Sequence, residues 1–211
     1  MKTKKKILVA LALVGCAILL VAGSIAGTMA YLTSTTETVE NTFTVGNVSI
    51  TLDETKVDAY GVVIENEDPV VKNEYKLIPG HTYTKDPTIH VDADSEECWL
   101  FVKVVNGISD IEVAADATNA ANESETIAEQ MAAKGWTAVA GAANVYAYSV
   151  KVAAGSNIVV FDAFTIAGNA DLDGDPDYSN ATITVTAYAI QADGFNTAAE
   201  AWAAAPASFA N

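Results

Sequence analysis

Four aspartates recur at every second position of one short run, a spacing of oxygen ligands that suits a calcium ion. The run reads Asp-Leu-Asp-Gly-Asp-Pro-Asp, and its carboxylates belong to Asp171, Asp173, Asp175 and Asp177. It is not an EF-hand loop, because glycine stands at the fourth position instead of the sixth and Thr182 takes the twelfth, where a bidentate glutamate is required. The run predicts a looser Ca²⁺ loop between strands, and a solvated acidic turn is the alternative.

Few other side chains have types and spacings that suit chemistry. His81 and His90 are the only histidines, and the His-Glu-x-x-His pattern of zinc hydrolases is absent. Cys98 lies in an apolar stretch, where a free cysteine usually packs as a small hydrophobic residue. No serine-hydrolase, phosphate-loop or dinucleotide motif occurs, so we expect the protein not to be an enzyme. A second acidic run either completes a cation site or is simply solvated; it comprises Asp92, Asp94, Glu96 and Glu97.

The elements that position these residues are predicted to be short strands. Over residues 182–190 apolar and polar residues alternate, as in a half-buried antiparallel strand, whereas residues 98–105 are apolar on both faces, as in a central strand. A first strand over 43–52 is expected to bend at Gly46. Shorter strands are predicted near 60–65, 75–78, 87–92, 136–140, 145–152 and 158–166. This pattern indicates an all-β domain, a jelly-roll-like antiparallel β-sandwich.

Two short helices are expected to interrupt the strands. The first covers residues 124–134 and ends at Gly135; its capping box is either Asn122 with Glu125 or Thr126 with Glu129. The second covers residues 197–205, before a proline.

The N-terminal region has the pattern of an export signal. Four lysines within the first six residues precede an apolar run from Ile7 to about Ala30, which ends in small residues. Cleavage after Ala30 is the main interpretation; an uncleaved membrane anchor and a lipoprotein signal modified at Cys16 are the alternatives. Residues 1–30 are therefore predicted to be a signal peptide, and residues 31–211 a single secreted domain.

The predicted mature chain is strongly acidic. Residues 31–211 hold seven lysines, no arginine and all 27 acidic residues, which gives a net charge of −20. This balance argues against nucleic acid and against anionic membrane surfaces as partners, because both require cationic side chains. Cys98 would be the only cysteine left, so the domain must be stable without an intrachain disulfide.

Several segments are similar to those of a known protein family. They are Gly27-Thr-Met-Ala-Tyr-Leu-Thr-Ser, Asn41-Thr-Phe-Thr-Val-Gly-Asn-Val-Ser-Ile-Thr-Leu, Leu77-Ile-Pro-Gly-His-Thr-Tyr-Thr-Lys-Asp-Pro-Thr, Cys98-Trp-Leu-Phe-Val-Lys-Val and Ala187-Tyr-Ala-Ile-Gln-Ala-Asp-Gly-Phe. With these segments the chain resembles the TasA/camelysin family, Gram-positive secreted proteins that carry a SipW-dependent type of signal peptide.

The resemblance implies a jelly-roll domain, removal of the signal by a SipW-type signal peptidase, and self-association into fibres of the biofilm matrix. In such fibres the N-terminal strand of one mature subunit completes the sandwich of its neighbour, and here the donor arm would be about residues 31–40. We therefore expect a secreted structural protein of the extracellular matrix or cell surface. A camelysin-like metallopeptidase and a monomeric cell-surface binding module are the alternatives.

Overall fold

A computed structural model describes residues 47–113, 125–174 and 176–206, all of which belong to the compact unit that spans residues 45–211. The predicted signal peptide (1–30), the predicted donor arm (31–40) and the expected bend at Gly46 lie outside the described residues. Among the described residues, no helix has the length and apolar character that crossing a membrane would require.

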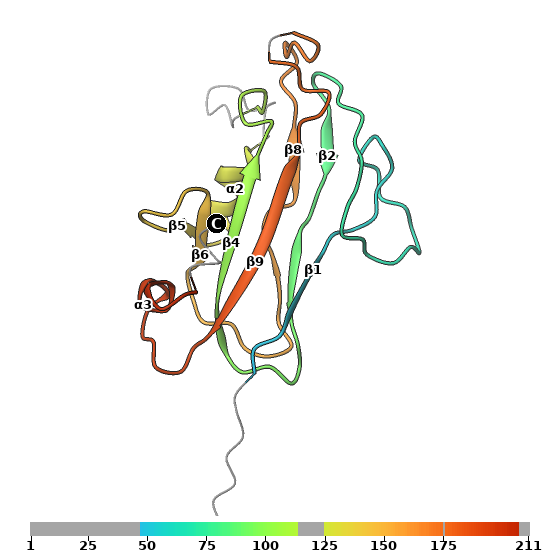
Figure 1. Cartoon of the computed structure of the whole chain (residues 1–211). Helices are drawn as coiled ribbons and strands as arrows, with labels where there is room; N and C mark the ends of the chain where they lie inside the picture. The colour runs from blue at the N-terminus through green and yellow to red at the C-terminus, as the bar shows by residue number, and fades with distance from the viewer. Residues whose placement is uncertain (1–46, 114–124, 175, 207–211) are drawn as a thin grey trace, which may run out of the picture. The chain divides into compact units, whose positions relative to one another are not determined.

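The described residues form a mostly β structure with two short helices (Figure 1). The strands are β1 (Ile50–Asp53), β2 (Thr82–Thr84), β3 (Thr88–Val91), β4 (Cys98–Asn106), β5 (Trp136–Ala138), β6 (Val145–Tyr148), β7 (Asn157–Val159), β8 (Ala163–Thr165) and β9 (Ile183–Gln191). The helices are α2 (Ile127–Ala133) and α3 (Ala198–Ala203).

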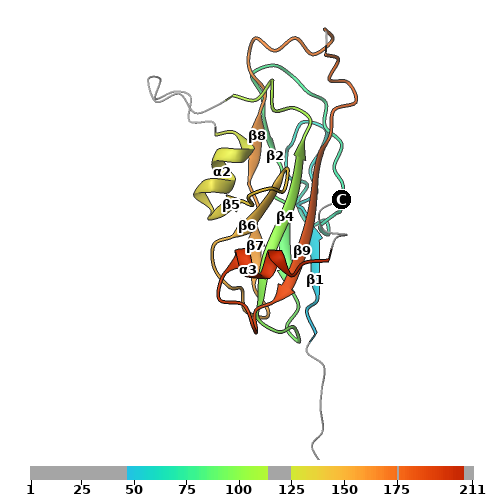
Figure 2. The same ribbon diagram turned by 60° about the vertical axis from the view of Figure 1, so that its left-hand side comes forward.

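The strands pair into three antiparallel sheets. One has the order β5-β6-β4-β9, the second the order β1-β3-β7, and the third consists of β2 and β8. The nine-residue ladder between β4 and β9 runs from Cys98 opposite Gln191 to Asn106 opposite Ile183. β9 and β1 therefore both lie at the edge of their sheets, and they are neighbours in space without being paired to each other (Figures 1 and 2).

The main hydrophobic core receives side chains from all three sheets. Ile89 of β3, Tyr83 of β2 and Leu100 of β4 are fully buried in it. β4 is buried on its other face as well, where Trp99 and Phe101 pack beneath Ala201 and Trp202 of α3. The prediction that residues 98–105 form a central strand is thus confirmed, and the second apolar face is explained by α3.

Both predicted helices are present. Thr126 begins α2 with a complete capping box, in which its hydroxyl accepts a hydrogen bond from the Glu129 amide and the Glu129 carboxylate accepts from the Thr126 amide. Of the two expected boxes this one is formed, and the Asn122 alternative lies outside the described residues. Gly135 ends the helix with a φ of +92°, a backbone conformation that favours glycine.

Two predicted strands are not formed. Residues 60–65 contain a tight turn instead, because the Asp58 carboxylate accepts hydrogen bonds from the Tyr60 and Val62 amides and Gly61 adopts a φ of +76°. Residues 75–78 form no strand: the Lys76 amide donates a hydrogen bond to the Ala59 carbonyl, and Tyr75 and Leu77 pack against the core. The stretch 158–166, predicted as one strand, is divided between β7 and β8.

Candidate functional site

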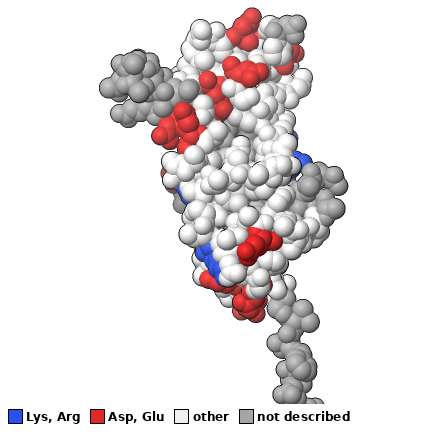
Figure 3. All heavy atoms as spheres, turned by 90° about the vertical axis from the view of Figure 1, so that its left-hand side faces the viewer, with Lys and Arg blue, Asp and Glu red and all other residues white. Residues whose placement is uncertain are grey.

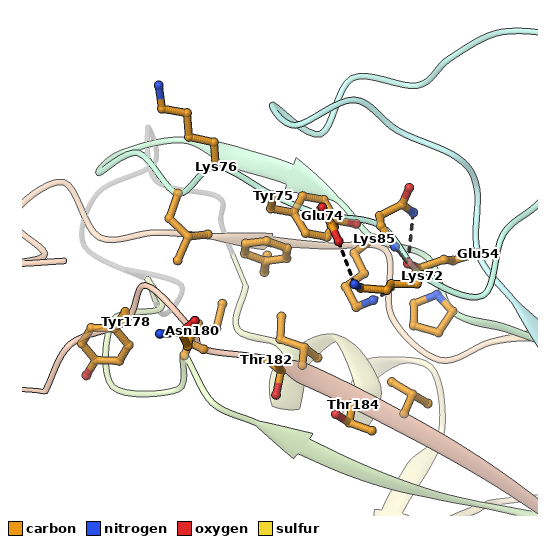
Figure 4. Close-up of a pocket in the computed structure, with 18 of the residues that line it drawn as sticks. Glu54, Lys72, Glu74, Tyr75, Lys76, Lys85, Tyr178, Asn180, Thr182 and Thr184 are labelled. Carbon is orange, nitrogen blue, oxygen red and sulfur yellow. Dashed lines mark hydrogen bonds and ion pairs between the residues drawn. The ribbon is translucent and has the colours of Figure 1, made fainter. Parts of the chain in front are cut away.

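A groove of about 1140 Å³ lies between the edge of β9 and the opposite wall formed by β1 and residues 71–77 (Figure 4). Thr184 lies on β9, and Tyr178, Asn180 and Thr182 lie on the segment that leads into it; Tyr75 and Lys72 belong to the facing wall. Apolar side chains that are only partly buried line both sides; they include Leu52, Leu77, Leu172, Ile183 and Val185. The main core is therefore incompletely covered along this groove.

The backbone of β9 presents unpaired hydrogen-bonding groups on its groove side. Cys98 of β4 exchanges both of its backbone hydrogen bonds with Val152, so its N–H and C=O point away from β9. Hydrogen-bonded and non-hydrogen-bonded pairs alternate along an antiparallel ladder, so the backbone of Gln191 opposite Cys98 points away from β4. By the same alternation, four further residues of β9 point outward: Ile183, Val185, Ala187 and Ala189. Within the described residues none of these four has a backbone partner on that edge.

The edge of β1 has the same character. Glu54 exchanges backbone hydrogen bonds of 2.8 Å with Val70, so its backbone faces away from β3. Because the direction of these groups alternates along a strand, the N–H and C=O of Ile50 and Leu52 also face away from β3. No described residue supplies them with backbone partners. Two free strand edges thus border one groove that opens onto apolar side chains.

A buried carboxylate fastens the wall of residues 71–77 to β1. Glu54, only 5% exposed, accepts hydrogen bonds of 3.0 Å from the backbone amide and the side-chain amide of Asn73, and it forms an ion pair with Lys85. The Asn73 side chain also accepts a hydrogen bond from the Val57 amide. Since a buried charge that loses its partner is strongly destabilising, this network holds the wall in a defined position.

Tyr75 belongs to the same wall, formed by residues 71–77. Its hydroxyl donates a 3.0 Å hydrogen bond to the Thr84 carbonyl, and its ring lies edge-on against Tyr83 and Phe164. Burial, followed by the nearby Glu54 carboxylate, raises the pKa of the Tyr75 hydroxyl well above its ordinary value. The hydroxyl is therefore neutral at physiological pH and acts as a fixed hydrogen-bond donor.

The predicted calcium run lies at one end of the groove. Asp173 lines the groove, and a Cβ added at Gly174 would lie against the Asp171 carboxylate, so a larger residue there would displace that side chain. Asp177 accepts hydrogen bonds from the Ser179 amide and hydroxyl, which lower the pKa of its carboxyl. Asp175 lies outside the described residues, and among those described no three acidic, histidine or cysteine side chains are grouped to hold a metal ion. The calcium loop stays a prediction.

The two histidines lie in separate settings. His81 contacts the Tyr60 carbonyl at 2.8 Å, whereas His90 lies between the Asp53 carboxylate, 2.9 Å away, and the Asn157 side chain. The hydrogen bond to Asp53 raises the pKa of His90 above its ordinary value of 6.5. His90 thereby links β1, β3 and β7 across the face of one sheet.

Cys98 is fully buried in β4, as its apolar surroundings predicted. Burial raises the pKa of its thiol to about 11, and the neighbouring Glu97 adds to the effect. The thiol is therefore protonated and inaccessible, in keeping with a packing role.

The second acidic run lies beside the point where the described chain begins. Asn47 accepts a hydrogen bond from the Glu96 amide, and the Ser49 hydroxyl donates to the Asp92 carboxylate. All four acidic side chains of this run are exposed, and we call residues 92–97 the acidic loop. Asn47, the first described residue, is thus held against this loop.

Sequence reasoning did not identify the groove or the role of Glu54. One signal for Glu54 was present, because the alternation that places Ile50 and Leu52 on one face of β1 also places Glu54 there. An acidic residue on an apolar face indicates a buried, paired carboxylate. Its partners Asn73 and Lys85 are distant in sequence and carry no comparable signal.

Comparison with protein-family models, with curated proteins and with solved structures yields no match to the chain.

Proposed function

We propose that the protein is a secreted structural component of the extracellular or biofilm matrix, and that it assembles by inserting residues 31–40 of one subunit into the groove of another. The observation that supports this function best is the groove itself. It combines free strand edges on β9 and β1 with apolar side chains of the core that are only partly covered. An extended segment that enters such a groove gains main-chain hydrogen bonds and covers apolar surface at the same time.

The sequence of residues 31–40 suits this role. It reads Tyr-Leu-Thr-Ser-Thr-Thr-Glu-Thr-Val-Glu, which is rich in residues that favour strands. In an extended segment side chains alternate, so Tyr31 and Val39 would share one face. That face would cover apolar residues of the groove, and the backbone would pair with the edge of β9.

In this proposal the antiparallel sheets represent a jelly-roll sandwich that the incoming strand completes. Residues 1–30 direct export, and cleavage after Ala30 by a SipW-type signal peptidase frees the arm. The resemblance to the TasA/camelysin family and the acidic composition favour a location in the matrix or at the cell surface.

Assembly of two purified proteins, residues 31–211 and residues 41–211, tests the function. We expect residues 31–211 to form fibres visible by negative-stain microscopy, and residues 41–211 to remain monomeric in sedimentation velocity. Circular dichroism of both proteins checks that the shorter one is folded. Each sample is examined with and without Ca²⁺, because the predicted calcium loop lies at one end of the groove.

Two outcomes would contradict the proposal. If residues 31–211 stay monodisperse under every condition, the protein is not a fibre subunit, and a monomeric binding module becomes the better interpretation. If both proteins assemble equally well, the subunits associate without the arm. Proteolysis by the pure protein that a chelator abolishes would instead favour the camelysin-like metallopeptidase.

A further inference from the structure

The lysines of this acidic chain are concentrated at the groove. Three of the seven lysines that follow residue 30 line it: Lys72, Lys76 and Lys85. On the face that carries α3 and β5, by contrast, acidic side chains clearly outnumber lysines (Figure 3). Four acidic residues also line the groove, so lysines and acidic residues stand there in a ratio of three to four. In residues 31–211 as a whole the ratio of lysines to acidic residues is seven to 27.

Two of the three lysines remain open to a partner. The ammonium group of Lys85 is buried against Glu54, with the Lys85 side chain only 11% exposed. Lys72 pairs with Glu74 on the surface, where its side chain stays 72% exposed, and an exposed pair of this kind holds its members weakly. Lys76 is exposed and has no ion pair among the described residues; Figure 4 shows its side chain extending outward, away from Thr182. Lys72 and Lys76, with Glu74 between them, thus give this wall a rim of net positive charge, which we call the cationic rim.

The length of the chain between arm and domain limits where the donor subunit can lie. Six residues, 41–46, separate the arm from Asn47, and a fully extended chain covers about 25 Å between Glu40 and Asn47. Asn47 is hydrogen-bonded to the acidic loop. When an arm occupies a groove, Asn47 of the donor and the acidic loop beside it therefore lie within about 25 Å of the point where the arm leaves the acceptor.

We propose that the acidic loop of the donor subunit, through Asp94, Glu96 and Glu97, docks on the cationic rim of Lys72 and Lys76 of the acceptor. The proposal rests on the proposed assembly function and adds a second contact to the inserted arm. The three carboxylates have no ion pair among the described residues, and they lie on the loop that anchors the start of the described chain. Opposite charges on the two subunits attract each other and favour the orientation that brings the acidic loop to the cationic rim.

Charge reversal on each side tests the contact in proteins that comprise residues 31–211. The rim variant is Lys72→Glu with Lys76→Glu, and the loop variant is Asp94→Lys with Glu96→Lys. At about 0.05 M salt, where screening is weak, we expect each variant alone to need about tenfold more protein for assembly than the wild type. A protein with all four substitutions, and an equimolar mixture of the two variants, should recover assembly because opposite charges again meet.

The control Lys103→Glu with Lys151→Glu makes the same change in net charge as the rim variant. Lys103 lies on the α3-covered face of β4 and Lys151 lies over the Trp99 ring, away from the groove. This control should assemble like the wild type, and added salt should reduce the difference between the rim variant and the wild type. If the reversals have no effect, or the four-fold variant is no better than either single-side variant, the contact is wrong. The arm-dependent function itself fails if residues 31–211 stay monodisperse, or if residues 41–211 assemble as well as residues 31–211.

Discussion

Val185→Pro should weaken assembly without unfolding the domain. The Val185 amide points away from β4, so the isolated domain loses no ladder hydrogen bond when proline removes it. Proline is tolerated on an edge strand when the missing N–H faces outward. We therefore expect Val185→Pro to change the free energy of unfolding by less than about 1 kcal/mol.

The same substitution has a larger effect on strand insertion. The inserted arm would lose the hydrogen bond that the Val185 amide donates, and one of its carbonyl groups would be left without a partner. Together these losses are worth about 2 kcal/mol, and about 1.4 kcal/mol corresponds to a factor of ten in an equilibrium constant. Val185→Pro should thus raise the protein concentration needed for assembly by about 30-fold.

Two matched variants separate the backbone effect from other changes. Thr186 faces β4 with its backbone and pairs with Lys103, so Thr186→Pro should lower the free energy of unfolding by about 1–3 kcal/mol. Val185→Thr keeps the amide and nearly the shape of the side chain, so it should assemble within a few-fold of the wild type. Urea unfolding followed by fluorescence and sedimentation of the polymer measure the two effects. If folded Val185→Pro assembles at the wild-type concentration, the arm does not pair with β9.

Three further predictions concern the isolated domain. Cys98 should not react with a thiol reagent at pH 8 until denaturant is added, because burial raises the pKa of its thiol to about 11; fast labelling of native protein would contradict this. The ion pair of His90 with Asp53 should stabilise the domain fully below pH 6.5 and lose this effect as pH rises through the raised pKa of His90. In urea unfolding, His90→Gln should remove this contribution to the pH dependence of the free energy of unfolding. If the variant keeps the pH dependence of the wild type, the role of His90 is refuted. Gly61→Ala should destabilise the domain by about 1–3 kcal/mol, because the added Cβ would lie 2.7 Å from the backbone of β2 at a φ of +76°. Gly141→Ala, at a φ of +80° with nothing within 4 Å, should cost only about 1 kcal/mol.

The parts of the fold that could be predicted from the sequence are those that local patterns determine. β4 and β9 are each nine residues long, and a run of that length shows its periodicity clearly. The α2 cap could be predicted because the capping box joins Thr126 and Glu129, which are only three residues apart in the sequence. The turn at Gly61 was missed because the apolar residues around it, among them Val62 and Ile64, are exposed instead of buried.

The groove could not be predicted, because nothing local determines it. Its walls are β9 and residues 71–77, which are more than a hundred residues apart in the chain. The wall of residues 71–77 is positioned by the buried network around Glu54 and Lys85, whose members no periodicity relates. The sequence did indicate a strand-forming arm, but the site that would receive it emerged only from the arrangement of the sheets in space.

The composition of the arm indicates which interaction would hold it. Of its three large apolar residues, Tyr31 and Val39 share one face in an extended strand and Leu32 faces the other way, so at most two of them can enter the groove together. The outward edge of β9, by contrast, offers the N–H and C=O groups of five residues, of which Ile183 and Val185 line the groove. Main-chain pairing would therefore supply most of the affinity, and it depends little on side-chain identity. A threonine-rich arm fits this requirement, because threonine favours the strand conformation without adding apolar surface that would aggregate before insertion. Something other than the arm's side chains would then have to fix the register of the arm against β9. The proposed contact between the acidic loop and the cationic rim would do this.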